Sequence, residues 1–510
     1  MTPTNLCTLL TTSMVLTLAC LTIHSNASAD NTPIDVGSEK QLFIDDLFFA
    51  TSQGIQLQVN PAHKTGELNV QRDQPWESAT LNWFSVMEDR AGTLKGENSP
   101  RAKYRMWYET YDIEGWPTTD DTSFCYAEST DGIKWTKPDL GLSSYQEKTT
   151  NNILFRQIGP EGAHSRVHGA SVFKDPNAPK EERYKAVSQG MFASKGTPPY
   201  YVAGMYSADG LRWTRYAEPI CEVFSDSQYS GFWDDQTKQY TIYGRVAGRG
   251  RALGRSTSED FTFFEPLELV LETDDQDPPN SDLYNPAAHK YPYAANAYFM
   301  FPSLFQHDTE TLDIHLAVSR DGVTWTWPQK GNAFIPLGKP GEFDSGSLYM
   351  GQGILRVGDE LFHYYGGSPI KHNESKLENL ILPGNSRTFS RVTSRLDGLV
   401  SVEAKEENSF FITPPLRFTG NILKLNADVR DGGYLRVALL DEQGEAIPGK
   451  TADDCDAITG DSVDALVLWK EDGDLTALAG APIRLRIELH HASLYAFRFT
   501  TGYAGNERDH

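Results

Sequence analysis

Ser129–Trp135, with the sequence STDGIKW, decides the fold, because two close copies follow it along the chain. The copies are SADGLRW at Ser207–Trp213 and SRDGVTW at Ser319–Trp325. In each copy the Asp-Gly pair predicts a tight turn, since Gly tolerates a positive φ and the Asp carboxylate can accept hydrogen bonds from nearby backbone N–H groups. The Trp then returns to a strand and offers a large ring for packing against a neighbouring sheet. The stretch therefore predicts a repeated β-hairpin unit.

Two degenerate copies extend the series, STSEDF at Ser256–Phe261 and SRLDG at Ser394–Gly398. Pairs of alternating apolar runs precede each copy, as expected of strands. The copies are unequally spaced, which places insertions in loops while the strand core repeats. An all-β fold with five four-stranded blades around a central channel is predicted, because radial repetition leaves few free sheet edges.

The C-terminal part of the chain has a different texture. No further turn motif appears, and alternating strands such as Leu423–Ala427, Tyr434–Leu440 and Ile483–Leu489 are separated by Gly-containing turns. A chain of 510 residues is also too long for one ordinary domain. We therefore predict a five-bladed β-propeller over residues 30–408, as the catalytic domain, and a small β-sandwich over residues 409–510, as an accessory domain.

Composition limits the partners. The chain has 46 Lys plus Arg against 69 Asp plus Glu, a formal net charge of −23. Such a surface repels polyanionic backbones, so no nucleic-acid partner is expected. Net charge says nothing about a single cleft, and a local basic pocket for an anionic sugar is compatible with it. The expected partner is a carbohydrate substrate.

Residues 1–29 predict a signal peptide. An apolar run over Leu9–Leu21 is followed by the small residues Ala27–Ala29, which suit a cleavage site. The segment lacks an initial Lys or Arg, and a retained anchor or a lipid-modified Cys20 are the alternatives. We expect a secreted or periplasmic protein without a membrane span in its mature form. The remaining cysteines have neither a disulfide pattern nor metal-type spacing: Cys125, Cys221 and Cys455.

The inner strands of a propeller converge on one end of its axis, so polar residues that precede them can share a pocket. Each predicted blade supplies one candidate catalytic residue: Glu77, His168, Asp226, Asp282 and Asp344. Clustered carboxylates raise the pKa of at least one member, which keeps a general acid protonated. The alternative roles are turn caps for the aspartates and a hydrogen-bonded structural role for His168.

Sugar binding calls for flat apolar rings and polar groups around the same pocket. The candidate substrate-binding residues are Trp76, Gln228, Arg245, Tyr284, Tyr349 and His372. Arg245 could pair with a carboxylate of the ring or bind a carboxylate or sulfate of the substrate.

Tyr104–Tyr108 (YRMWY), followed by Tyr126–Pro138, resembles the secreted bacterial five-bladed propellers related to glycoside hydrolase families 32 and 43. The resemblance covers about Gln41 to Ala404, and the C-terminal sandwich is similar to the module that often follows the family 32 propeller. It implies the propeller fold and glycosidase chemistry, although one fold hosts many activities.

The chain departs from these families at the catalytic positions. Those enzymes use Asp, Asp and Glu in the first three blades, where this chain has Glu77, His168 and Asp226. Neither an Asn-Asp-Pro-Asn nor an Arg-Asp-Pro motif is present, so fructan hydrolysis is not predicted. Some related propellers that act on marine galactans use a His as the acid, which draws attention to His168.

The leading hypothesis is a secreted glycoside hydrolase that uses carboxylate general acid/base catalysis in the central pocket. A non-catalytic carbohydrate-binding propeller is one alternative. A polysaccharide lyase, with His168 or Tyr284 as base and Arg245 neutralising a uronate, is another. No cofactor is expected, and a structural Ca²⁺ at the axis is left open. The sugar, the linkage and the oligomeric state are not predicted.

Overall fold

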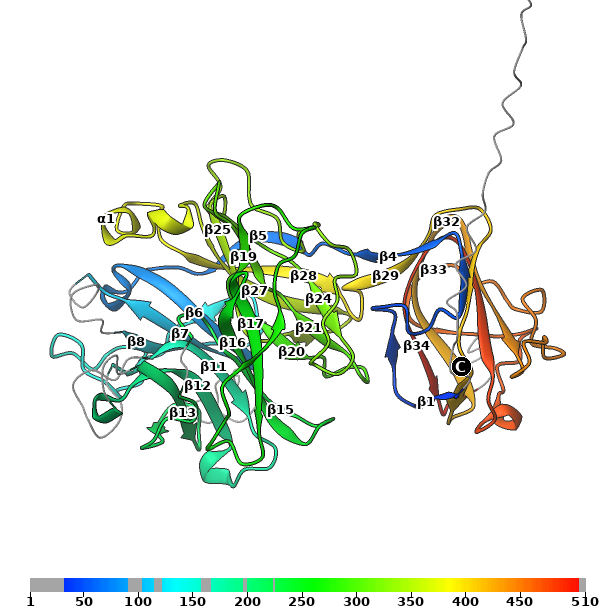
Figure 1. Cartoon of the computed structure of the whole chain (residues 1–510), viewed down its shortest axis with the longest axis horizontal. Helices are drawn as coiled ribbons and strands as arrows, with labels where there is room; N and C mark the ends of the chain where they lie inside the picture. The colour runs from blue at the N-terminus through cyan, green and yellow to red at the C-terminus, as the bar shows by residue number, and fades with distance from the viewer. Residues whose placement is uncertain are drawn as a thin grey trace, which may run out of the picture.

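The computed structural model describes residues 32–89, 103–113, 122–156, 167–195, 200–222 and 225–503, and it is nearly all β. Its larger part is a propeller-like arrangement of antiparallel sheets (Figure 1). The first sheet, ordered β10-β8-β7-β6 with β9 beside β8, contains β6 (Thr80–Glu88), β7 (Tyr104–Tyr111), β8 (Ser123–Ser129), β9 (Trp135–Thr136) and β10 (Ile153–Phe155).

Two four-stranded sheets follow in chain order. The second sheet contains β11 (His168–Lys174), β12 (Tyr184–Met191), β13 (Tyr200–Ser207) and β14 (Trp213–Arg215). The third contains β15 (Ser230–Asp234), β16 (Gln239–Gly248), β17 (Gly250–Ser258) and β18 (Glu268–Leu271). In each, the strands pair in sequence order, as predicted for a blade.

An eight-stranded sheet completes the ring. Its order is β19-β22-β23-β25-β27-β28-β5, with β26 on β27, and its strands are β19 (Ser281–Leu283), β22 (Ser303–Gln306), β23 (Thr311–Ile314), β25 (Ser347–Met350), β26 (Leu355–Val357), β27 (Glu360–Ser368), β28 (Thr388–Arg395) and β5 (His63–Val70). A three-stranded sheet accompanies it, with β20 (Ala288–Lys290), β21 (Tyr298–Met300) and β24 (Ala317–Ser319). Strands of the fourth and fifth predicted blades therefore belong to one continuous sheet, which is joined by the pairing of Leu312 in β23 with Ser347 in β25.

Helical structure in the described residues is short. It consists of α1 (Leu377–Leu380) and the 3₁₀ turns η1 (Pro75–Glu77), η2 (Lys180–Glu182), η3 (Ala193–Lys195), η4 (His372–Glu374) and η5 (Thr476–Leu478). No helix of the described residues is long and apolar enough to cross a membrane. The predicted signal peptide, residues 1–29, lies outside the described residues.

The hydrophobic core of the propeller-like part lies between neighbouring sheets. Trp107 of the first sheet packs in one cluster with Val172 and Met205 of the second. Another cluster joins Phe84 of the first sheet to Phe389 of the eight-stranded sheet, where the ring closes. These strands are rich in aromatic and β-branched residues, which suit a pleated surface that is buried on both faces.

The repeated turn motif holds neighbouring sheets together. In the first copy, Asp131 Oδ1 accepts hydrogen bonds of 2.8 Å from the backbone N–H groups of Ile133 and Lys134, as predicted. In the second copy, the Gly210 carbonyl accepts a 2.6 Å hydrogen bond from Trp107 Nε1 of β7. The Gly322 carbonyl accepts one from Tyr243 of β16 in the same way, at 2.5 Å. Each of these turns is thus bonded to an aromatic side chain of another sheet.

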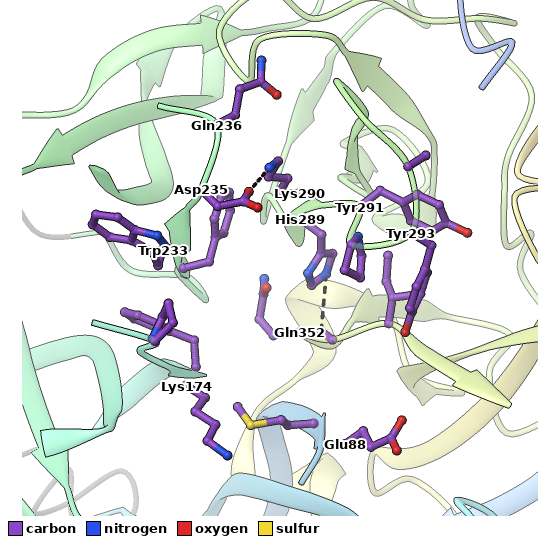
Figure 2. A pocket seen from close by; sticks show the side chains of 18 of the residues that line it. Glu88, Lys174, Trp233, Asp235, Gln236, His289, Lys290, Tyr291, Tyr293 and Gln352 are labelled. Carbon is purple, nitrogen blue, oxygen red and sulfur yellow. Dashed lines mark hydrogen bonds and ion pairs between the residues drawn. The ribbon is translucent and has the colours of Figure 1, made fainter. Parts of the chain in front are cut away.

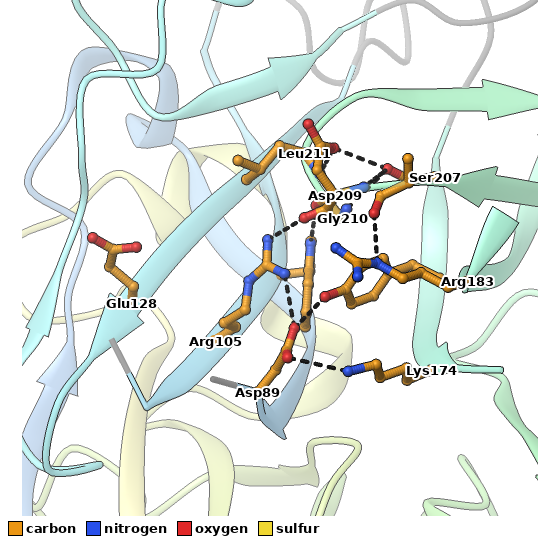
Figure 3. A network of polar contacts seen from close by, with 12 residues as sticks. Asp89, Arg105, Glu128, Lys174, Arg183, Ser207, Asp209, Gly210 and Leu211 are labelled. Carbon is orange, nitrogen blue, oxygen red and sulfur yellow. Dashed lines mark hydrogen bonds and ion pairs between the residues drawn. The ribbon is translucent and has the colours of Figure 1, made fainter. Parts of the chain in front are cut away.

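The same bond closes the ring, because the Gly132 carbonyl accepts a hydrogen bond from the Tyr364 hydroxyl of β27. Around Gly210 the contact is reinforced by a buried ion pair (Figure 3). Arg105 of β7 donates to the Asp209 carbonyl at 2.7 Å and to Asp89 at 3.0 Å. Lys174 of β11 lies on the other side of Asp89, at 3.4 Å.

We expect Gly322→Ala to destabilise the fold by about 2–3 kcal/mol. Gly322 has φ +72°, and an added Cβ would lie 2.8 Å from Tyr243 Oη. Ala in a left-handed conformation costs about 1–2 kcal/mol, and a disturbed buried hydrogen bond costs about 1 kcal/mol more. Denaturant unfolding followed by far-UV circular dichroism measures the difference.

Gly331→Ala is the matched control. Gly331 also has a positive φ, +86°, but nothing lies within 4 Å of an added Cβ. It shares the backbone cost and lacks the contact. Equal losses of stability in the two variants would contradict the role of the Gly322 turn in holding two sheets together through its hydrogen bond with Tyr243.

The C-terminal strands form a second body beside the propeller-like part (Figure 1). Its sheet contains β29 (Val400–Ala404), β30 (Ser409–Ile412), β32 (Ile422–Leu440), β33 (Gly460–Leu466) and β34 (Arg484–Thr500). Four strands from the start of the chain join these C-terminal strands, which include β31 (Leu416–Phe418): β1 (Ile34–Gly37) on β31, β2 (Gln41–Leu42) on β34, β3 (Thr51–Gln53) on β30 and β4 (Ile55–Val59) on β29. The predicted division at residue 408 does not include this pairing of β1–β4 with the C-terminal strands.

Candidate functional site

Polar side chains of the inner strands cross the axis of the propeller-like part. Gln228 Nε2 donates to the Phe84 carbonyl at 2.7 Å and to the Ala170 carbonyl at 3.0 Å. Gln352 Nε2 donates to Ser230 Oγ at 2.6 Å. These bonds link the first, second, third and eight-stranded sheets, and they separate two ends of the axis.

At the end where the inner strands begin, three side chains form a chain of contacts. His168, the first residue of β11, has its Nδ1 2.9 Å from Glu109 Oε1 of β7. Its Nε2 lies 3.3 Å from Asp226 Oδ1, in the loop before β15. Glu109 and His168 are buried, whereas the Asp226 side chain is 56% exposed. A buried carboxylate thus orients an imidazole that faces an accessible carboxylate.

Glu109 is held in its ionised form. Burial alone would raise its pKa, but His168 and hydrogen bonds from the surrounding side chains keep the pKa below its ordinary value. The Tyr111 hydroxyl donates to Glu109 Oε1 at 2.6 Å, and Asn82 Nδ2 does so at 2.9 Å. The second oxygen, Oε2, accepts a 2.8 Å bond from the Gly169 backbone.

Gly169 is required where it stands. It has φ +68°, and a Cβ there would lie 2.1 Å from the Ser227 carbonyl oxygen. The β11–β12 register also shifts between His168 and Ser171. This irregularity turns the backbone so that the Gly169 N–H points at Glu109 and the loop of Asp226 packs against it.

The Tyr284 ring contacts two arginines, each of which is paired with a carboxylate. The Arg245 guanidinium is 5.2 Å from the Tyr284 ring centroid and 3.6 Å from Asp226 Oδ2. The Arg251 guanidinium is 5.3 Å from the same ring and 3.0 Å from Asp282 Oδ2. Asp282 is only 3% exposed and also accepts a 2.9 Å contact from His307.

An aromatic wall continues from Tyr284. Trp83 stacks on Tyr284 with centroids 6.4 Å apart, and Tyr349 packs edge-on against both rings. His372 lies 4.8 Å from the Tyr284 ring, and its Nδ1 is 2.8 Å from the Tyr349 hydroxyl. Trp83 also lies 6.4 Å from the His168 ring, which connects the wall to the catalytic candidates. Trp83 and Tyr349 are buried, so Tyr284, which is partly exposed, is the ring of this wall that the flat apolar face of a sugar could contact.

The structure thus gathers seven of the predicted residues in one region: His168, Asp226, Asp282, Arg245, Tyr284, Tyr349 and His372. Gln228 lies beneath them in the axial layer.

Three predicted residues lie in separate networks. Glu77 is buried and accepts from Lys137 Nζ at 2.8 Å and the Tyr108 hydroxyl at 2.7 Å. Burial raises its pKa despite the opposing charge of Lys137. Trp76 donates to Asn152, away from the aromatic wall. Asp344 is buried against Lys64 at 2.7 Å and the Tyr365 hydroxyl at 2.6 Å. The structure does not bring these three to His168.

Four residues of the region were missed by sequence reasoning: Trp83, Glu109, Arg251 and Arg387. The candidate catalytic residues were those that precede predicted inner strands, whereas Glu109 lies inside the buried strand β7. A carboxylate within the aromatic run YRMWYETY was the available signal, since buried strands rarely carry an unpaired charge. Trp83 lies where the β6–β7 register shifts between Leu81 and Phe84. No pattern in the sequence predicts this shift.

Metal binding has no evident site in the part of the chain that the structure describes, where no group of three or more His, Cys, Asp or Glu side chains could hold an ion.

A cavity of about 1000 Å³ lies at the other end of the axis (Figure 2). The inner strands reach it after crossing the axial layer, at Glu88, Lys174 and Trp233. His289 and Gln352 form its floor, and Tyr293 stands opposite Trp233. Lys40 and Arg498 of the second body also line it. None of the predicted site residues lines this cavity.

The sequence matches no family model, and no curated protein matches it. Several solved structures are similar. One described as a glycoside hydrolase is 14% identical, with a TM-score of 0.43 over 66% of this chain and 92% of that one. An N-acetylgalactosamine deacetylase from F. plautii, in complex with blood group B trisaccharide, is 15% identical, with a TM-score of 0.42 over 67% and 96%. An exo-inulinase from Aspergillus awamori is 12% identical, with a TM-score of 0.39 over 85% and 100%.

Proposed function

We propose that this chain is a glycoside hydrolase whose site is the region around His168, Asp226 and Tyr284. The observation that carries the proposal is the contact between His168 and the accessible Asp226, with the buried Glu109 behind the imidazole and an aromatic wall beside it. Proton transfer to a glycosidic oxygen needs a group that a sugar can reach and whose protonation is controlled.

Asp226 is the proposed proton donor, because its side chain is 56% exposed. It gives a proton to the leaving oxygen, and His168 Nε2, 3.3 Å away, returns one to Asp226. Glu109 stabilises the imidazolium through Nδ1 and acts as a positioning residue.

Asp282 is the proposed second carboxylate. Asp282 and Asp226 each pair with an arginine that contacts the Tyr284 ring, so both carboxylates lie near that ring. Asp282 Oδ2 is occupied by Arg251 and His307, while Oδ1 has no hydrogen-bond partner among the described residues. We assign to Asp282 the activation of the attacking water, which requires that water reach the buried Oδ1 when the sugar binds.

Product analysis in ¹⁸O-labelled water tests the reaction class. The mature protein is incubated with a panel of plant and algal oligosaccharides, and products are identified by mass spectrometry. We expect ¹⁸O in a newly formed reducing end. An unlabelled, unsaturated product would instead indicate a lyase, and binding without any product would indicate a carbohydrate-binding propeller.

We further infer a five-bladed propeller, counting β19-β22-β23 and β25-β27-β28-β5 as separate blades, because the single pair Leu312–Ser347 joins them. The C-terminal body would then be the predicted β-sandwich. Export through residues 1–29, and the relationship to glycoside hydrolase families 32 and 43, complete the proposal.

A further inference from the structure

Three arginines, two from the β16–β17 hairpin and one from the segment before β28, converge on the aromatic wall. Arg245 lies in β16, Arg251 in β17 and Arg387 immediately before β28. Arg245 and Arg251 contact the Tyr284 ring, and the Arg387 guanidinium lies 4.2 Å from the Tyr349 centroid. The two rings are 5.5 Å apart, so the three positive charges surround one small area.

His372 lies within this group of arginines. It packs between Tyr284 and Tyr349, and its pKa is lowered to about 4 by burial and then by Arg251, Arg387 and Arg245. His372 is therefore neutral at physiological pH and adds no fourth charge to the group. The Tyr349 hydroxyl bonds its Nδ1 and fixes the ring.

Carboxylates of the protein do not neutralise this group fully. Arg251 is paired with Asp282 at 3.0 Å, whereas Arg245 lies 3.6 Å from the largely exposed Asp226. Arg387 has no ion pair with a carboxylate of the described residues; its Nη1 bonds the Asn82 amide oxygen, and its Nε is buried without a hydrogen-bond partner. A buried donor without a partner is costly unless a ligand or water satisfies it.

The chemistry of this group suits an oxyanion. A guanidinium presents its donors as a planar fork that matches a carboxylate or sulfate, and stacking on an aromatic face leaves that fork available. The chain as a whole carries a net charge of −23. A concentration of arginines around the sugar-binding wall is therefore a local reversal of the surface charge.

We propose that Arg245, Arg251 and Arg387 bind an oxyanion substituent of the sugar, a uronate carboxylate or a sulfate ester, while Tyr284, which is partly exposed and backed by the buried Tyr349, contacts the sugar ring. This inference rests on the proposed function and names the substrate class of the same site. Arg387 supplies a positive charge that is not paired with a carboxylate of the described residues. Arg245, which lies 3.6 Å from Asp226, would contact both the oxyanion and Asp226.

Binding to the Asp226→Asn protein tests the oxyanion site apart from turnover. Calorimetry compares oligogalacturonate with its methyl ester, and a sulfated carrageenan oligosaccharide with its desulfated form. We expect at least one charged member to bind about 10-fold to 100-fold more tightly than its neutral partner, because charge-assisted bidentate contacts are lost in the latter. The pair that shows the difference identifies carboxylate or sulfate. Equal binding within both pairs, or binding of neither charged member, would overturn the inference.

Arg387→Gln tests the residue itself. We expect KM for the charged substrate to rise about 10-fold or more, with a small change in kcat, since the contact is made to substrate and transition state alike. Arg356→Gln, an exposed arginine of β26, is the control. An Arg387→Gln protein with unchanged KM would overturn the role of Arg387.

The outcomes separate the two proposals. Hydrolysis of neutral glycans only, with equal binding within both pairs, would leave the hydrolase and remove the oxyanion site. Tight binding of a charged member with an unsaturated product would retain the oxyanion site and remove the hydrolase.

Discussion

Asp226→Asn is expected to lower kcat/KM by about 10²-fold to 10⁴-fold, the usual contribution of a positioned general acid or base. Asn keeps the size of the side chain but cannot deliver the proton that the leaving oxygen needs. The loop position and 56% exposure of Asp226 predict little effect on stability. Initial rates on the substrate found in the product screen, with the thermal midpoint as a check of folding, measure the effect.

Glu77→Gln is the matched control for Asp226→Asn. Both changes remove one carboxylate from a residue that the sequence put forward as catalytic, but Glu77 is buried against Lys137 and Tyr108. We expect it to lower stability by about 1–3 kcal/mol through the disturbed buried bonds and to leave kcat/KM nearly unchanged. A folded Glu77→Gln protein without activity, or an active Asp226→Asn protein, would contradict the assignment.

Glu109→Gln is expected to lower kcat by about 10²-fold or more, because the amide no longer stabilises the imidazolium of His168 or selects its tautomer. The limb of the pH–rate profile that depends on His168 should also move to lower pH, since the imidazolium loses its ionic partner. The pH dependence of kcat on both proteins measures the shift. A change in stability alone would not produce it.

The free energy of unfolding of the wild-type protein should also depend on pH differently from that of the Glu109→Gln protein. The folded-state pKa of Glu109 is lowered, so its carboxylate contributes stability above the unfolded pKa of about 4.3, and the contribution is lost as pH falls through the folded value. Tyr111→Phe is the comparison, because it removes the 2.6 Å hydrogen bond to Glu109 and the 2.9 Å contact with His168 Nδ1 but keeps the charge of Glu109. A Glu109→Gln profile that coincides with the wild-type profile would contradict the positioning role.

Much of the fold could be predicted from the turn motif. Its local bonds, such as those of Asp131 to Ile133 and Lys134, depend on neighbouring residues and follow from turn chemistry. The sheet pairings of the second and third predicted blades have the same local character. By contrast, β1–β4 find partners near the other end of the chain, and no periodicity in the sequence signals such distant pairing.

The candidate site was predictable where position alone decides it. His168, Asp226 and Tyr284 precede inner strands, and the structure brings them together. Glu77 and Asp344 occupy similar positions in the sequence, but their carboxylates are bound by Lys137 and Lys64, which are distant in the sequence. Arg387 was missed because it lies in the loop immediately before β28, where no strand pattern marks it, and its long side chain reaches the Tyr349 ring.

The pairing of both chain ends has a consequence for synthesis. Strands β1–β4 are synthesised well before their partners, which lie between Val400 and Thr500. Strand β5 likewise has no partner until β28 has been synthesised, and only then can the ring close. The first and second sheets pair locally and can form as they emerge, while β1–β4 remain unpaired edges until the segment after residue 400 has been synthesised. A nascent chain that stalls before residue 400 would therefore display open strand edges, which are the surfaces that chaperones must cover.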